Sequence, residues 1–223
     1  MNTKHKKPTL TKKQRHKLRV QQVRRQKIFL TCLFLLIVGC ILLRFSKFSG
    51  RQKETHQLNA ACEAYRDEVS SEAAQYDMSD YVDLILAVMM QESSGQGTDP
   101  MQSSEGAYNT RYPQQPNGIT DPSYSISCGI QELKYALEKA VCTGPTDLSK
   151  IRLALQAYNF GADSYFAYLE ENGQTVWTTQ SAQAFAQMAS GNTQRDEDDP
   201  LHDPAGPWDY GDQYYPDHVL RYY

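Results

Sequence analysis

The first 53 of the 223 residues contain no aspartate or glutamate, although they carry 15 of the 23 lysines and arginines. Residues 54–223 hold the other 8 lysines and arginines against all 26 acidic residues, which gives this part a net charge of −18. The overall charge of −3 therefore hides two regions of opposite sign. Such an asymmetry predicts that the two regions face different surroundings.

The sequence also lacks the residue spacing of a metal site. Its five histidines are scattered at positions 5, 16, 56, 202 and 218. Structural and catalytic metal sites need ligands at short, regular intervals. No metal and no other cofactor is therefore expected.

Cysteines are too few for a disulfide framework. Cys32 and Cys40 lie in an apolar run, which leaves Cys62, Cys128 and Cys142, so at most one bridge can form among these three. If one helix covers the stretch between Cys128 and Cys142, they lie about 20 Å apart and cannot pair. A bridge from Cys62 to either of them and three free thiols both remain open.

An uncharged run of 16 residues, Ile28 to Leu43, separates the two regions. As a helix it covers roughly 24 Å, and flanking residues up to position 48 extend it toward the hydrocarbon core of about 30 Å. No clear small-x-small cleavage site follows, which favours a signal anchor over a cleaved signal peptide. We therefore expect one transmembrane helix over residues 28–48.

The basic arm at residues 1–27 is expected to stay in the cytoplasm by the positive-inside rule. Its lysines and arginines are fully explained by the orientation of the membrane helix and by attraction to anionic lipid headgroups. No nucleic-acid partner is therefore expected. The polar residues 49–58 predict a short stalk. Residues 59–223 are then placed outside the cell, on the wall side of a single-pass membrane protein.

Hydrophobic periodicity is helical almost throughout residues 59–223, which predicts an all-α, predominantly helical soluble domain. The expected helices lie over 60–76, from Ser79 or Asp80 to a stop at Gly95, over 127–141, around 151–158, over 162–171 and 179–190, and after Pro216. Residues 191–207 are acidic and predict a surface loop.

Residues 96–124 break this pattern with three glycines and four prolines. An irregular loop of this length in a compact domain is uncommon and is more often functional than accidental. We expect a loop that faces a substrate.

Glu92 lies in the last turn of the apolar helix, three residues before Gly95. A carboxylate there faces the negative end of the helix dipole, and Met89 and Met90 add apolar surroundings. Both effects predict a raised pKa, which a general acid for glycoside cleavage requires near neutral pH. The plain alternative is a solvated glutamate at a helix end.

Five segments, in order, carry a family resemblance. Glu92-Ser93 resembles the first motif of goose-type lysozymes and soluble lytic transglycosylases. Asp99-Pro100-Met101-Gln102 resembles that family's Gly-Leu-Met-Gln strand, and Ser125 to Gly129 resembles its Asn-Ile-x-x-Gly helix start. Ala157 to Gly161 resembles its Ala-Tyr-Asn-x-Gly motif, and Tyr215 with Val219 resembles its final Tyr-Val-x-x-Val element. Asp99-Pro100 departs from the family's Gly-Leu.

The segments are also similar to the lysozyme-like domain in cell-wall hydrolases of Gram-positive conjugative elements. Many of those proteins carry a second, cysteine-dependent peptidase domain. This chain ends at Tyr223 without one, so no peptide-cutting activity is expected.

The resemblance implies a muramidase that cuts the β-1,4 bond between N-acetylmuramic acid and N-acetylglucosamine in peptidoglycan glycan strands, with Glu92 as catalytic acid. It implies substrate-binding roles for Ser93, Met101, Gln102, Tyr158, Asn159 and Tyr215. It also implies local wall opening for a conjugation or type IV secretion-like complex.

Two-carboxylate hydrolysis needs a partner for Glu92. Asp99, Glu105 and Asp121 are candidates, and Glu105 is favoured because the resemblance places an acidic residue just beyond Met-Gln. A lytic transglycosylase, in which the substrate's own hydroxyl attacks, is the first alternative. A non-catalytic peptidoglycan-binding scaffold is the second, and the intact Glu92 argues against it.

Overall fold

The structure is a computed structural model that describes residues 57–223. The predicted cytoplasmic arm at 1–27, the predicted transmembrane helix at 28–48 and most of the predicted stalk at 49–58 lie outside the described residues. Within the described part, no helix combines the length and the apolar character that a membrane crossing requires.

Residues 57–223 fold into helices and loops and contain no strand, which confirms the predominantly helical class. The helix bounds are α2 Ala60–Glu63, α3 Arg66–Gln75, the 3-10 helix η1 Ser79–Tyr81, α4 Val82–Ser93, α5 Pro122–Lys139, α6 Leu148–Phe160, α7 Ala162–Glu171, α8 Thr179–Ala189, α9 His202–Ala205 and α10 Tyr215–Leu220. Gln194 and Trp208 form one isolated antiparallel bridge.

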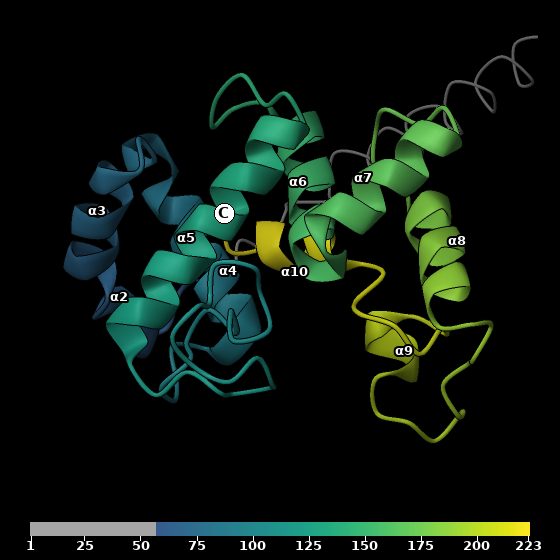
Figure 1. Cartoon of the computed structure of the whole chain (residues 1–223), viewed down its shortest axis with the longest axis horizontal. Helices are drawn as coiled ribbons and strands as arrows, with labels where there is room; N and C mark the ends of the chain where they lie inside the picture. The colour runs from purple at the N-terminus through teal and green to yellow at the C-terminus, as the bar shows by residue number, and fades with distance from the viewer. Residues whose placement is uncertain (1–56) are drawn as a thin grey trace, which may run out of the picture. The chain divides into compact units, whose positions relative to one another are not determined.

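Helix α6 is the centre of this arrangement. It packs against α5, α7 and α10, while α4 packs against α3 and α10. In Figure 1, α2 to α5 lie on one side of α6 and α7 to α9 lie on the other. The middle of α6 is buried because neighbours surround it, with Ile151, Ala154, Leu155 and Ala157 fully buried. This burial fixes the end of α6, which carries Tyr158 and Asn159.

Several predicted boundaries shift. The helix expected over 60–76 is divided into α2 and α3. The expected capping by Ser79 or Asp80 is wrong, because η1 precedes α4 and the N-cap residue of α4, Tyr81, makes no side-chain capping bond. The acidic stretch 191–207 contains the short helix α9. By contrast, α7 has the predicted bounds and α8 ends one residue early.

Proline explains two other differences. Helix α5 begins at Pro122, five residues before the predicted start, and Asp121 accepts hydrogen bonds from the amides of Ser123 and Tyr124 at 3.1 and 3.4 Å. Helix α10 begins at Tyr215, so Pro216 lies inside its first turn. Proline fits the first turn because the amide it lacks has no intrahelical partner there.

The three cysteines of the domain, Cys62, Cys128 and Cys142, are free thiols. The alternative of a bridge from Cys62 is therefore wrong. Cys62 and Cys128 are fully buried and act as small apolar core residues.

Candidate active site

Helix α4 delivers Glu92 to the site. Its residues 84 to 89 are all fully buried, so the helix is held on every side until its last turn. It ends at Ser93, and Ser94 closes it in the left-handed conformation with φ 56°. The hydroxyl of Ser93 donates to the carbonyl of Pro100 at 2.8 Å. Ser93 thereby ties the helix end to the long loop beside Glu92.

Glu92 is half-buried, and the hydroxyl of Tyr215 donates a hydrogen bond to its Oε1. Burial raises the pKa of Glu92 to about 7. The hydrogen bond from Tyr215 acts against this rise, whereas the charges of Asp212 and Asp99 add to it. The predicted rise in pKa is confirmed, and burial is its main cause.

Tyr158 links this acid to the loop. Its ring stacks on that of Tyr215, with centroids 6.4 Å apart and an interplanar angle of 20°. Its hydroxyl donates to the carbonyl of Met101 at 2.9 Å. Burial, followed by the charges of Glu132 and Glu92, raises its pKa well above the usual value, so Tyr158 stays a neutral donor.

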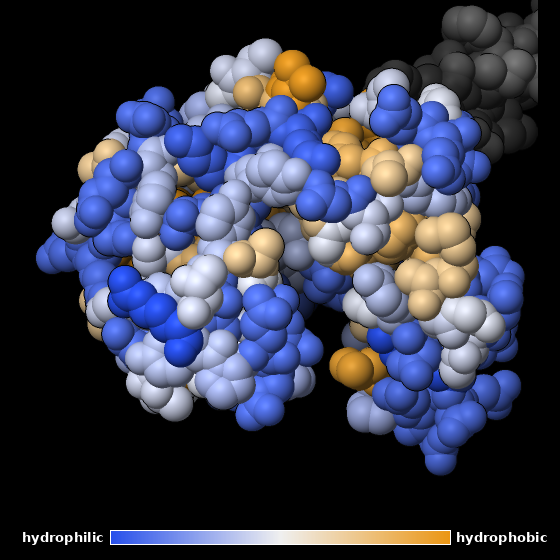
Figure 2. Space-filling view, viewed as in Figure 1, coloured by the Kyte–Doolittle hydropathy of each residue, from blue (hydrophilic) through white to orange (hydrophobic). Residues whose placement is uncertain are grey.

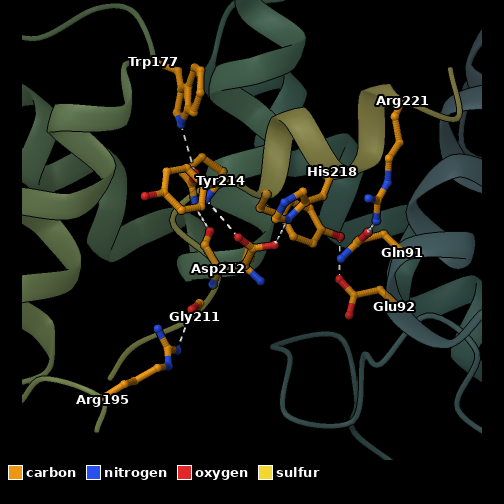
Figure 3. Close-up of polar contacts among 12 residues, drawn as sticks. Gln91, Glu92, Trp177, Arg195, Gly211, Asp212, Tyr214, His218 and Arg221 are labelled. Carbon is orange, nitrogen blue, oxygen red and sulfur yellow. Dashed lines mark hydrogen bonds and ion pairs between the residues drawn. The ribbon is translucent and has the colours of Figure 1, made fainter. Parts of the chain in front are cut away.

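Asn159, the next residue, holds the segment before α10. Its Oδ1 accepts the backbone N–H of Asp212 at 2.8 Å. The carboxylate of Asp212 in turn accepts from the amide of Tyr214 at 2.9 Å and lies 2.5 Å from Nδ1 of His218 (Figure 3). No sequence pattern points to Asp212, because it lies outside any helical periodicity.

Residues Asp99 to Gln102 form a turn within the predicted long loop, because the amide of Gln102 donates to the carbonyl of Asp99 at 3.0 Å. Met101 is fully buried, and a Cβ at Gly129 would lie 2.6 Å from its Cβ. Gln102 is exposed, has φ 49°, and donates from Nε2 to Oδ1 of Asn117 at 3.0 Å.

The three candidate partner carboxylates lie in different surroundings. Asp99 is buried, and its oxygens accept from the amides of Ser103 and Ser104 at 3.1 and 3.2 Å and from the hydroxyl of Ser125 at 2.6 Å. Asp121 caps α5, as described above. Glu105 is exposed and lines a cavity, so it differs from the other two in being open to a ligand.

This cavity has a volume of about 620 Å³. It lies between the long loop, α5, the end of α6, the start of α7 and Tyr210, where the surface is hollowed (Figure 2). Of the predicted site residues, it brings together Gln102, Glu105, Tyr158 and Asn159. It also contains Glu132 of α5, which sequence reasoning missed.

The lysozyme-like family model matches residues 60–223. The chain is 34% identical over 169 residues to the bifunctional muramidase/DL-endopeptidase CwlT of Bacillus subtilis (strain 168), a match that covers 76% of this chain and 44% of CwlT. It is 40% identical over 115 residues to the uncharacterized membrane protein YocA of the same organism, across 50% of this chain and 45% of YocA.

A solved structure shares the fold. The crystal structure of a Staphylococcus aureus subsp. aureus Mu50 protein, described as similar to a lipoprotein of the NLP/P60 family, aligns with a TM-score of 0.61 at 28% identity. The alignment covers 75% of this chain and 54% of that one. The chain thus spans about half the length of the relatives it matches.

Proposed function

The chain belongs to the lysozyme-like family, and we propose that it is a muramidase of peptidoglycan glycan strands. The bond cut is the β-1,4 bond between N-acetylmuramic acid and N-acetylglucosamine. The main support is the carboxyl of Glu92, whose pKa burial raises to about 7 beside the hydroxyl of Tyr215. Such a carboxyl keeps its proton in about half of the molecules at neutral pH and in nearly all of them at lower pH, as a general acid requires.

In the proposed reaction, Glu92 gives its proton to the glycosidic oxygen as the bond from that oxygen to C1 of the muramic acid breaks. A water molecule attacks C1 and loses its proton to a carboxylate, for which we propose Glu105. The hydroxyl of Tyr215 then stabilises the carboxylate that Glu92 has become. CwlT, a relative described as a muramidase and endopeptidase, supports this class of reaction.

The substrate-binding residues contribute in two ways. We propose that Gln102, Tyr158 and Asn159 contact the glycan, since all three line the cavity beside Glu105. For Ser93 and Met101 we propose support of the groove from beneath. Ser93 bonds to the loop backbone and Met101 is fully buried.

A lytic transglycosylase with the same acid is the second candidate. It is favoured by one observation: Asp99 and Asp121, two of the three possible partner carboxylates, already hold backbone amides. In that reaction the C6 hydroxyl of the muramic acid attacks C1 in place of water and gives its proton to the carboxylate that Glu92 has become, so no second carboxylate is needed.

Digestion of purified peptidoglycan by the full chain distinguishes these reactions. Mass spectrometry of the glycan ends should give reducing muramic acid for a muramidase and anhydromuramic acid for a transglycosylase. Glu92→Gln keeps the shape of the side chain but removes the acid, and should abolish release. Full activity in that variant, or no glycan products from the unaltered chain, would sink the proposal.

We also propose that residues 28–48 anchor the domain on the outer face of the cytoplasmic membrane, with residues 1–27 inside the cell. The apolar run and the membrane protein YocA among the relatives support this setting. A role in local wall opening for a conjugation or secretion complex rests on the sequence resemblance. Protease treatment of intact spheroplasts should remove residues 59–223 and leave the basic arm; protection of the domain contradicts the topology.

A further inference from the structure

Arg111, in the long loop, carries a positive charge that no other described residue neutralises. Among residues 57–223, five of the lysines and arginines form ion pairs with carboxylates: Arg66, Lys134, Lys139, Arg152 and Arg195. Lys150 and Arg221 donate to neutral oxygens at 3.4 and 3.0 Å. Within this part of the chain, the guanidinium of Arg111 makes neither an ion pair nor a hydrogen bond, although residues 54–223 have a net charge of −18. An unpaired cation in such acidic surroundings points to an anionic ligand.

The guanidinium of Arg111 is nevertheless held in a fixed place. It lies over the ring of Tyr124, 4.6 Å from the centroid. The hydroxyl of Tyr124 donates to the carbonyl of Tyr108 at 3.2 Å and accepts from the amide of Thr110 at 3.0 Å. The ring of Tyr112 packs against that of Tyr124, with centroids 5.5 Å apart. Because this platform is fixed, little side-chain freedom remains to be lost when the guanidinium binds a ligand.

Arg111 lines a second cavity, with a volume of about 640 Å³, which we call the Arg111 cavity. It lies between α3, the long loop and the first turns of α5, and its volume is within the usual range of ligand pockets. Ala107 and Tyr108 line both this cavity and the one that contains Glu105. The Arg111 cavity therefore adjoins the proposed glycan groove.

The Arg111 cavity offers charges of both signs. Glu72 of α3 and Asp121 line it together with Arg111. Asp121 already accepts from the amides at the start of α5, whereas Glu72 accepts only from the neutral side chain of Gln75, at 2.7 Å. The two carboxylates repel a polyanion, but a ligand with both a carboxylate and an amine is attracted at either end.

Peptidoglycan contains a ligand of this kind. Its muramic acid carries a short stem peptide, which has free carboxylates and the free amine of a diamino residue. Four extended residues span up to roughly 14 Å. Since Ala107 and Tyr108 border both cavities, a stem that leaves a glycan strand in one cavity passes over these two residues into the other.

We propose that the Arg111 cavity binds the stem peptide, with the guanidinium of Arg111 paired to a carboxylate of the peptide and Glu72 facing its free amine. The planar guanidinium suits a carboxylate because it can donate two parallel hydrogen bonds. The inference rests on the proposed function and extends it from the glycan strand to the peptide that the strand carries.

The test uses the full chain with Glu92→Gln and, as the probe, the free pentapeptide of L-alanine, γ-linked D-glutamate, L-lysine and two D-alanines. Calorimetric titration should detect binding that weakens about tenfold in the additional variant Arg111→Ala, through the loss of one charged pair. Arg111→Lys keeps the charge without the paired donors and should recover part of the affinity. Lys150→Ala removes a cation outside the cavity and is the matched control, which should bind as the parent does.

Three results overturn the inference: no binding of the pentapeptide to the parent, equal affinity in Arg111→Ala, or equal affinity of the parent for a pentapeptide whose carboxylates are converted to amides. Tighter binding of poly(glycerol phosphate), the backbone of a teichoic acid, than of the pentapeptide also overturns it. Arg111 is exposed, so its variants should keep the denaturant midpoint of the parent. A lower midpoint together with lost binding in both variants counts against the proposal.

Failure of the muramidase assignment looks different. The unaltered chain then releases no glycan ends from peptidoglycan, while the pentapeptide still binds in a way that depends on Arg111.

Discussion

The hydroxyl of Tyr215 donates a hydrogen bond to Oε1 of Glu92, although 123 positions of sequence separate the two residues. Helix α10 packs against both α4 and α6, and Tyr215 is almost fully buried in this contact. The bond favours the charged carboxylate, whereas burial favours the neutral acid. These opposing effects set the pKa of the proposed catalytic acid near neutrality, and each can be altered separately.

Removing the hydroxyl of Tyr215 should raise the pKa of Glu92 above about 7, because the bond that stabilises the carboxylate is lost. In Tyr215→Phe we expect the alkaline limb of the pH profile of kcat/KM to move upward by on the order of one pH unit. Turnover of glycan strands measured between pH 5 and 9 checks this.

Tyr214→Phe is the matched control for that variant. The hydroxyl of Tyr214 receives a bond from Gln183 at 3.1 Å and makes none to Glu92. Its profile should equal that of the unaltered chain. A limb that stays in place in Tyr215→Phe, or moves to lower pH, contradicts the role assigned to the hydroxyl.

The unaltered enzyme should lose activity as the pH rises through about 7. A general acid works in its protonated form, and above its pKa that form declines tenfold with each pH unit. Glu132→Gln should keep this decline, which separates Glu92 from the second carboxyl with a pKa of about 7. A decline that already begins near pH 4.5 would mean that burial does not shift Glu92.

The raised pKa of Glu92 also carries a cost in stability. Between the ordinary value of 4.5 and about 7 the folded chain holds a proton that the unfolded chain has released, so folding weakens as the pH rises across this window. Glu92→Gln removes the cost, and should gain roughly 1–3 kcal/mol in the free energy of unfolding at pH 8 and almost nothing at pH 4. Denaturant titrations at both pH values measure this.

Glu138→Gln provides the comparison, because Glu138 is exposed and should change stability by less than about 0.5 kcal/mol at either pH. A Glu92→Gln variant that is less stable than the parent at pH 8 would show that the carboxyl supports the fold. The combination of higher stability and lost activity is expected of a residue kept for chemistry.

Local sequence patterns were sufficient to predict those helices whose ends are determined by nearby residues in the chain. The apolar stripe of α4 and the glycine after it placed Glu92 in a last helical turn, and α7 ends before Gly173 as predicted. The start of α5 was missed because its first turns carry small residues in place of a wide apolar stripe. Ser125 and Cys128 are nevertheless fully buried there, through contacts that the sequence does not reveal.

The rest of the site depends on contacts between distant segments. Asn159 meets Asp212 from 53 positions away, and neither residue carries a pattern that points to the other. In the sequence, Glu132 looks like an ordinary polar residue of an amphipathic helix. Only the structure shows that the loop at Gly106 covers its carboxyl. The sequence predicts which polar residues lie on helices. Which of these side chains are buried away from solvent depends on tertiary packing.

The contact between Gly106 and Glu132 can be measured directly. Gly106→Ala should lower the free energy of unfolding by about 1 kcal/mol, because the new methyl group overlaps the Glu132 carboxyl and forces it aside. In a Glu132→Ala background the three nearest atoms to that methyl group are gone, so the same substitution should cost little. A double-mutant cycle of denaturant midpoints measures the difference, and a coupling energy above about 0.5 kcal/mol is expected. Additive effects would mean that the loop and the carboxyl do not meet in solution.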